Sequence, residues 1–140
     1  MATVKGVNYT LMTAVPVDHV LPDIADGRVR FMYDTYEASS LGAGSVIQLF
    51  RVLDNWRILD WKIWHDALGG SSTLDLGDVA DPNRYNTAED SSSAGIIVPL
   101  VAEINTGAFY KYTSNDIVSL TTAGASITGT IHVGMWYVID

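Results

Sequence analysis

The chain has 140 residues, no cysteine, and 16 acidic against 8 basic residues, which gives a formal net charge of -8 at pH 7. This length suits a single domain that buries about two-thirds of its unfolded surface without disulfides, and the lack of cysteine fits assembly in a reducing compartment. A surface of this sign repels phosphate backbones and anionic lipid headgroups, so neither nucleic acid nor a membrane is an expected partner.

The opening residues, MATVKGVNYT, lack the basic and apolar regions of a signal peptide, and no apolar run is long enough to span a membrane. We therefore expect a soluble protein without an export signal. The abundance of Val, Ile, Thr, Ser, Gly and aromatic residues favours strands over helices.

Residues 1–27 are expected to form an extended N-terminal arm, because Pro16 and Pro22 interrupt them and few positions are periodic. Only a short strand around residues 4–11 is predicted there. The segment is too apolar for a free tail, so we expect it to lie along its own domain or along a neighbouring subunit. Its candidate partner-binding residues are Val4, Val7, Tyr9, Leu11, Val15, Val17, Val20 and Leu21.

After the turn signal at Asp26-Gly27, residues 28–36 alternate and predict the first strand of a domain spanning residues 28–140. We expect Val29, Phe31 and Tyr33 to point inward and Arg28, Arg30 and Met32 outward. A linker rich in glycine and serine leads to a second predicted strand at residues 46–52.

Residues 56–65 also alternate, with Arg57, Leu59, Trp61, Ile63 and His65 on one side and Ile58, Asp60, Lys62 and Trp64 on the other. Gly69-Gly70 breaks the chain, and residues 72–77 alternate again, so a hairpin or corner is predicted. Trp61 and Trp64 fall on opposite faces. One of these large aromatic side chains is therefore expected to be exposed in the monomer and available to a partner.

Residues 79–95 are polar and turn-forming and predict a long surface loop, and the acidic stretch from Asp75 to Asp90 is expected to face solvent. Residues 96–101 predict a strand at an edge or with a bulge rather than a central strand, because Pro99 cannot donate a ladder hydrogen bond. Two short strands are predicted at residues 109–113 and 117–122.

The longest regular pattern closes the chain, with Ile127, Ile131, Val133, Met135, Tyr137 and Ile139 on one face and Thr128, Thr130, His132, Gly134 and Trp136 on the other. Together these segments predict an all-β fold, an antiparallel β-sandwich or jelly-roll-like domain of about eight strands with an extended N-terminal arm.

Few residues fit a chemical site. Asp75, Asp78 and Asp81 invite a calcium interpretation, but they do not match the known loop pattern and no glutamate supplies a bidentate ligand. Turn formation explains them better. The three histidines lack zinc-site spacing, and His65-Asp66 with Ser71 or Ser72 lacks a nucleophile elbow. We therefore expect no catalytic residue, no cofactor and no metal, and a protein that is not an enzyme.

A carbohydrate-binding or adhesive module remains an alternative, because exposed aromatic rings stack on sugar rings. Its candidate residues are Trp56, Trp64, Tyr85 and Trp136.

Three segments, RVRFMYDTYEASSLGAGSVIQL, ILDWKIWHDALGGSSTLDLGDVADPNRY and the closing SITGTIHVGMWYVID, resemble small structural proteins of tailed bacteriophage virions, some of which are capsid decoration or cement proteins. The resemblance covers residues 28–140 in order, and its most specific part is HDALGGSSTLDLGD. The WKIW segment is more aromatic than in similar proteins, and the arm does not align.

The resemblance implies a β-sandwich subunit, commonly trimeric, on the outer surface of the virion head, where it ties neighbouring major capsid proteins together after synthesis in the host cytoplasm. The expected partners are the major capsid protein and further copies of the chain, with Trp64 and Trp136 as anchors. Head-fibre and tail-associated positions stay open as alternatives.

Overall fold

The structure is a computed structural model that describes residues 28–140. Within this range the chain forms eight strands and one short helix. Their bounds are β1 (Arg30–Leu41), β2 (Val46–Val52), β3 (Trp56–His65), β4 (Thr73–Asp78), β5 (Asn86–Asp90), β6 (Gly95–Ile97), α3 (Val101–Ile104), β7 (Asp116–Ala123) and β8 (Ile127–Ile139).

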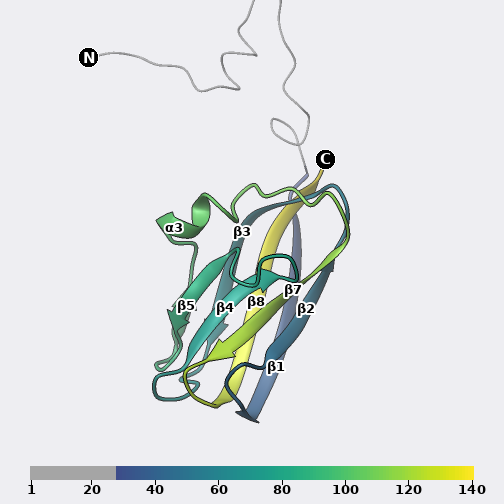
Figure 1. The fold of residues 1–140 in the computed structure, drawn as a ribbon. Coiled ribbons are helices and arrows are strands. Elements are labelled where there is room, and N and C mark those ends of the chain that lie inside the picture. The colour runs from purple at the N-terminus through teal and green to yellow at the C-terminus, as the bar shows by residue number, and fades with distance from the viewer. Residues whose placement is uncertain (1–27) are drawn as a thin grey trace, which may run out of the picture.

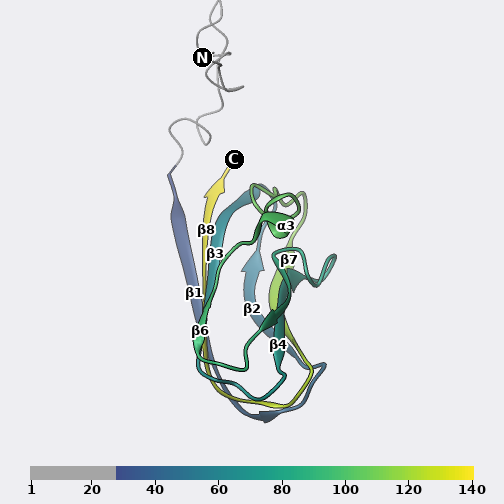
Figure 2. The ribbon, with the colours of Figure 1, turned by 90° about the vertical axis from the view of Figure 1, so that its left-hand side faces the viewer.

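The strands form two four-stranded sheets, which we call the first sheet (β1-β8-β3-β6) and the second sheet (β2-β7-β4-β5). All pairings are antiparallel. The chain passes back and forth between the two layers, which lie face to face in Figures 1 and 2. This strand order is that of a jelly roll, so the predicted all-β sandwich of about eight strands is confirmed.

The core lies between the two sheets and is built from the inward residues of both. The first sheet contributes mainly Ile58, Trp61, Ile63, Ile131, Val133 and Met135, and the second contributes Phe50, Val52, Leu74, Leu76, Val118 and Leu120. Each of these side chains is buried. Because the cluster draws on the central strands of both layers, apolar burial fixes the two sheets against each other.

Strands β2, β7 and β8 follow the sequence prediction closely. On β8 the alternation places Ile131, Val133, Met135 and Tyr137 in the core as expected, whereas Ile139 at the strand end is exposed. Strands β3 and β4 lie in different sheets, so the connection through Gly69-Gly70 is a corner rather than a hairpin.

The predicted orientation of β1 was wrong. Phe31 and Tyr33, expected inside, are 51% and 55% exposed, and Val29 is exposed as well. Met32, expected outside, packs against the core. Alternation shows which residues share a face but does not identify the buried face, and β1 carries large apolar side chains on both. As an edge strand it buries only the side that meets β2 and the core.

The predicted alternation in β3 holds only in its second half. Its register against β8 shifts between Ile58 and Asp60, so a bulge places Ile58 in the core together with Trp61 and Ile63. Beyond the bulge, Trp64 lies on the opposite side from Trp61 and is half-buried.

One loop prediction and one strand prediction also needed correction. The predicted loop at residues 79–95 contains β5, and Asp78, Tyr85 and Asn86, within the stretch from Asp75 to Asp90 that was expected to face solvent, are buried. Residues 109–113 form no strand and make one isolated bridge, between Lys111 and Arg57. In both places a tertiary contact, rather than local pattern, decides the conformation.

The arm predicted for residues 1–27, with its candidate partner residues, lies outside the described residues. The boundary between residues 27 and 28 therefore stays a prediction.

Candidate interaction surface

The outer face of the first sheet, which points away from the core, carries a cluster of aromatic side chains. Pairing register sets Phe31 of β1 opposite Trp136 of β8, and Trp64 of β3 opposite His132 of β8. Tyr33 lies between Phe31 and Thr35 along β1, on the same face. We call the five residues Phe31, Tyr33, Trp64, His132 and Trp136 the aromatic face.

The members of this face on β1 contact those on β8. The rings of Phe31 and Trp136 have centroids 4.8 Å apart, and those of Tyr33 and His132 stack at 5.9 Å. The Tyr33 hydroxyl lies 2.8 Å from Nδ1 of His132, and the Lys62 ammonium lies 5.7 Å from the Trp136 ring centroid. Phe31, Tyr33, His132 and Trp136 thus support one another through side-chain contacts.

Gly134 makes this arrangement possible. A Cβ atom at this position would lie 2.7 Å from the Phe31 ring and 3.1 Å from the Trp64 ring. Glycine thus allows two aromatic rings from the flanking strands to approach the backbone of β8. The result is a shallow hollow lined by Phe31, Tyr33, Trp64 and His132.

The outer face of the second sheet is different. Its pairing rows bring together Gln48, Ser119, Thr121, Asp75 and Thr73, which are small or polar, and Val46 is an exposed aliphatic side chain in the same rows. Since an ordinary soluble surface resembles this second face, the half-exposed rings of the first face mark it as the surface suited to a partner.

The sequence placed Trp64 and Trp136 among the candidate partner residues, and the structure brings them together on this face. It missed Phe31, Tyr33 and His132, because the first two were assigned to the core and the third was considered only as a half-exposed polar residue. Of the residues considered for sugar stacking, Tyr85 is buried, and Trp56 is half-buried and stacks on Tyr137 at 4.2 Å.

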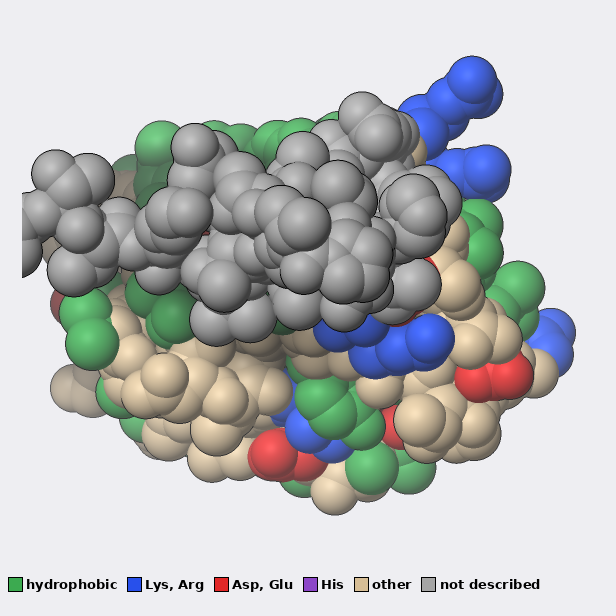
Figure 3. Space-filling model, turned by 90° about the horizontal axis from the view of Figure 1, so that it is seen from above, with side chains coloured by type: hydrophobic (Ala, Val, Ile, Leu, Met, Phe, Trp, Pro, Cys, Tyr) green, Lys and Arg blue, Asp and Glu red, His purple; other side chains and the backbone are tan. Residues whose placement is uncertain are grey.

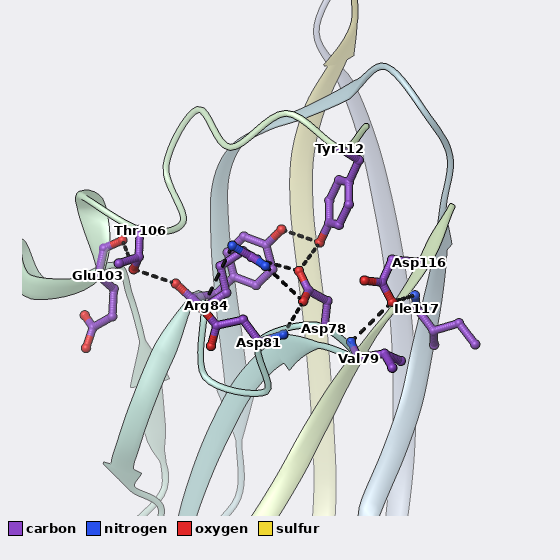
Figure 4. A network of polar contacts seen from close by, with 10 residues as sticks. Asp78, Val79, Asp81, Arg84, Glu103, Thr106, Tyr112, Asp116 and Ile117 are labelled. Carbon is purple, nitrogen blue, oxygen red and sulfur yellow. Dashed lines mark hydrogen bonds and ion pairs between the residues drawn. The ribbon is translucent and has the colours of Figure 1, made fainter. Parts of the chain in front are cut away.

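A cluster of polar side chains, shown in Figure 4, lies at one end of the second sheet. The buried carboxylate of Asp78 pairs with Arg84, whose Nε lies 2.5 Å from Oδ2. The same oxygen accepts a hydrogen bond from the Tyr112 hydroxyl at 2.9 Å, and the hydroxyls of Tyr112 and Tyr85 lie 2.6 Å apart. Backbone N–H of Asp81 donates to Oδ1 of Asp78 at 2.7 Å.

The electrostatics of this cluster indicate a structural role. Burial raises the pKa of both Tyr85 and Tyr112 far above that of a free tyrosine, which is itself protonated at pH 7. Burial acts to lower the pKa of Arg84, but its hydrogen bond and charge interaction with Asp78 raise it overall. The cluster therefore joins β4, the loop after it and the 105–115 segment through one buried ion pair.

This pairing also bears on the calcium interpretation. Asp78 is committed to Arg84, Asp81 lies 3.9 Å from the same guanidinium, and Asp75 accepts a hydrogen bond from the backbone of Ala88. Within residues 28–140 no group of three side chains suited to metal binding occurs.

His65, Asp66 and Ser72 do not assemble as a triad. The His65 ring donates from Nδ1 to the backbone carbonyl of Asp66 at 2.9 Å, and the buried Ser72 hydroxyl donates to the carbonyl of Gly69 at 2.7 Å. Each side chain thus supports its local turn.

Asp140, which follows the last strand, interacts with two basic side chains. Its Oδ2 lies 2.5 Å from Nη2 of Arg57 and 3.5 Å from Nζ of Lys111. Burial acts to raise the pKa of Asp140, but the hydrogen bond and charge of Arg57, aided by Lys111, outweigh it and lower the pKa. This ion pair links β8 to β3 and to the segment that carries Lys111.

We expect Asp140→Asn to lower the free energy of unfolding by about 1–2 kcal/mol at pH 7, because it removes charge-assisted hydrogen bonds. The pKa of Asp140 is lower in the folded protein than in the unfolded chain. Its ion pair therefore stabilises the fold fully at pH values above the pKa of the unfolded chain, and this stabilisation is lost as the pH falls through the pKa of the folded state. Urea denaturation of the wild type and of Asp140→Asn at several acid pH values should therefore show the difference between their free energies of unfolding decrease toward zero as the pH falls. A difference that stayed constant with pH would rule out the ion pair as its source.

No helix within residues 28–140 is both long and apolar enough to cross a membrane.

Fold and surface together define a jelly-roll β-sandwich with one aromatic outer face. No protein-family model and no curated protein matches the sequence. Among solved structures, the chain is similar in fold to a chain of the cyanophage Pam1 capsid asymmetric unit, with a TM-score of 0.70 and 20% identity over 81% of this chain and 86% of that one.

Two further capsid structures contain a similar chain. One is the capsid of Ralstonia phage GP4, with a TM-score of 0.63 and 20% identity over 81% of this chain and 86% of the other. The second is the acid-stable capsid of Helicobacter pylori bacteriophage KHP30, with a TM-score of 0.59 and 14% identity over 79% and 87%. At sequence identities of 14–20%, the similarity to these three structures establishes the fold alone.

Proposed function

We propose that this chain is a non-enzymatic structural protein of a bacteriophage virion, a capsid decoration or cement protein. It binds the outer surface of the phage head and stabilises contacts between major capsid proteins. The observation that carries the proposal is the combination of the aromatic face with a fold that recurs in three phage capsid structures.

The proposed stabilisation comes from surface area that is buried where neighbouring capsid proteins meet. A subunit that bridges neighbouring capsid proteins adds contact area where the shell separates most easily, and many copies act together, so each contact can be modest. Buried aromatic side chains contribute most to such contacts. Trp64 and Trp136 are the proposed anchors, and Phe31 and Tyr33 enlarge the surface around them.

The proposed partners are the major capsid protein and further copies of the chain, arranged as a homotrimer. Closed symmetry is favoured because it covers exposed apolar patches without open-ended growth. The N-terminal arm adds a second contact, in which Val4, Val7, Tyr9, Leu11, Val15, Val17, Val20 and Leu21 lie across the capsid protein or an adjacent subunit.

We expect Trp64→Ala to weaken binding to empty capsids by about 2 kcal/mol, roughly thirtyfold, while costing the monomer little stability. The ring lies on the outer face, so its removal takes away an anchor and leaves the core intact. Co-sedimentation with capsids gives the binding change, and chemical denaturation gives the stability change.

Two control variants bracket this result. Val46→Ala removes an exposed apolar side chain from the opposite sheet and should leave binding unchanged. Trp61→Ala empties a fully buried site and should cost about 3–5 kcal/mol of stability. If Trp64→Ala unfolds as Trp61→Ala does, or if it binds capsids as the wild type does, the aromatic face is not the anchor.

A carbohydrate-binding or adhesive module at a head fibre or tail is the second candidate. The hollow lined by Phe31, Tyr33, Trp64 and His132 favours it, because sugar rings stack on exposed aromatic side chains. A glycan screen separates the two functions, since a decoration protein should show no saturable sugar binding.

A further inference from the structure

Strand β1 is an open edge of the first sheet. It is 12 residues long and pairs with β8 in a register that runs without a shift from Arg30↔Tyr137 to Ala38↔Gly129. No strand within residues 28–140 pairs with its other side. A regular edge of this kind presents a row of backbone N–H and C=O groups, which another extended backbone can pair in full.

Hydrogen bonds made by β8 identify which backbone groups of β1 point to the open side. The N–H and the carbonyl of Thr130 both bond to Asp66, and the N–H of Thr128 donates to the carbonyl of Leu68. The even-numbered residues of β8 therefore turn their backbone groups toward β3 and the corner that follows it. In an antiparallel sheet these groups point alternately to the two sides of a strand, so the odd-numbered residues of β8 bond to β1.

The register then defines the open row of β1. Odd-numbered residues of β8 lie opposite even-numbered residues of β1. The N–H and C=O groups that point away from the sheet are therefore those of the odd-numbered residues, Phe31, Tyr33, Thr35 and Glu37. The N–H of Thr35 donates to Oδ1 of Asp34 at 2.8 Å, as expected for an amide that takes no part in the ladder.

The other three edge strands present no comparable row. Strand β5 has 5 residues and ends in Glu89-Asp90, β6 has 3 residues, and the register of β2 shifts between Gln48 and Phe50. Short strands, charged side chains and bulges are features with which proteins block the addition of a strand. Strand β1 has no register shift, proline or lysine between residues 30 and 38.

The side chains beside this edge indicate which kind of strand fits it. Phe31 and Tyr33 belong to the aromatic face and are more than half exposed, so a strand added at the edge would extend that face by one row. Arg28 and Arg30 are also exposed. Figure 3 looks onto the end of the sandwich where β1 begins, and hydrophobic and basic side chains are exposed near each other at its right. The fitting strand is apolar at alternate positions and carries a carboxylate near this end.

We infer that an extended segment of the capsid protein adds to the open edge of β1 and continues the first sheet. The inference rests on the proposed function, in which the capsid protein covers the aromatic face. The edge and this face are continuous, because Phe31 and Tyr33 contribute side chains to the face and backbone groups to the edge. Backbone hydrogen bonds fix the register of the added segment, and the aromatic side chains supply the apolar contact.

Hydrogen exchange resolved to single residues tests the alternation directly. In the free full-length protein, the amides of Phe31, Tyr33 and Glu37 should exchange rapidly. Those of Met32 and Tyr36, which bond to β8, should exchange slowly. On empty capsids the exchange of the first group should slow by roughly tenfold or more.

Two other results of this measurement would overturn the inference. Open-row amides that stay fast on capsids would mean that side chains alone make the contact. Open-row amides that are already slow in the free protein would mean that another segment of the chain, or a second copy, occupies the edge. Repeating the free-protein measurement at several concentrations distinguishes these two occupants.

A proline substitution removes one amide of the open row. Thr35→Pro should weaken co-sedimentation with capsids by roughly tenfold, because proline cannot donate a hydrogen bond and its ring obstructs an added strand. Circular dichroism should show a folded domain, since the pairing with β8 does not use this N–H. Thr35→Val removes the same hydroxyl but keeps the N–H, so the difference between the two variants measures the backbone contribution. Equal binding of the two variants contradicts strand addition.

A proline at the edge of the second sheet is the matched control. The N–H of Thr122 donates to the carbonyl of Ser45, so the N–H of Val46 points away from β7 by the same alternation. Val46→Pro should therefore fold and bind capsids as the wild type does. A loss equal to that of Thr35→Pro would show that the effect is not specific to β1.

The wild type separates this inference from the proposed function. A wild-type protein that binds capsids while its open-row amides stay fast contradicts strand addition alone. A wild-type protein that does not bind capsids contradicts the proposed function, and the inference with it.

Discussion

Removal of residues 1–24 is expected to abolish binding to empty capsids while the sandwich stays folded. Within residues 28–140 the core cluster runs from Ala38 to Tyr137 and draws on both sheets, so the domain has an apolar core without the arm. The arm itself is too apolar for a free tail. Circular dichroism measures the fold, and co-sedimentation with capsids measures occupancy.

A matched variant separates the apolar side chains of the arm from its length. Replacing Val15, Val17, Val20 and Leu21 with serine keeps the chain length and should reduce capsid binding nearly as much as deletion does. If the truncated protein still decorates shells at wild-type occupancy, the arm is not a capsid contact.

Asp78→Ala is expected to cost about 3–5 kcal/mol of stability, as much as the core substitution Trp61→Ala. The substitution removes the carboxylate closest to the Arg84 guanidinium and takes an acceptor from the Tyr112 hydroxyl and from the backbone N–H of Asp81. A loss of this size is a large part of the free energy of unfolding of a typical domain, which is about 5–15 kcal/mol. Urea denaturation monitored by tryptophan fluorescence gives the change.

Asp75→Ala in the same strand is the control for this variant. Its half-exposed carboxylate accepts one backbone hydrogen bond from Ala88, so we expect a loss of about 1 kcal/mol. If the two variants lose the same amount of stability, the buried ion pair does not hold the end of the second sheet.

Part of the candidate surface could be read from the sequence. Alternation about Trp64 and along β8 placed Trp64 and Trp136 away from the core, because a strand turns successive side chains to opposite faces. The same rule paired Phe31 with Tyr33 but assigned both to the wrong face, since nothing local distinguishes the inner side of an edge strand that is apolar on both sides.

The sequence by itself determined the class of the fold and the positions of strands β2, β3, β4, β7 and β8. Period-two alternation, turn residues and the lack of helical spacing each depend on only a few neighbouring positions. Such local signals can therefore be recognised in the sequence before the fold is known. The bulge in β3, the burial of Asp78 and Tyr85, and the joining of β1, β8 and β3 into one aromatic face were decided only by the tertiary structure. Each depends on which distant strand lies alongside, and that is set by packing of the two sheets rather than by local spacing.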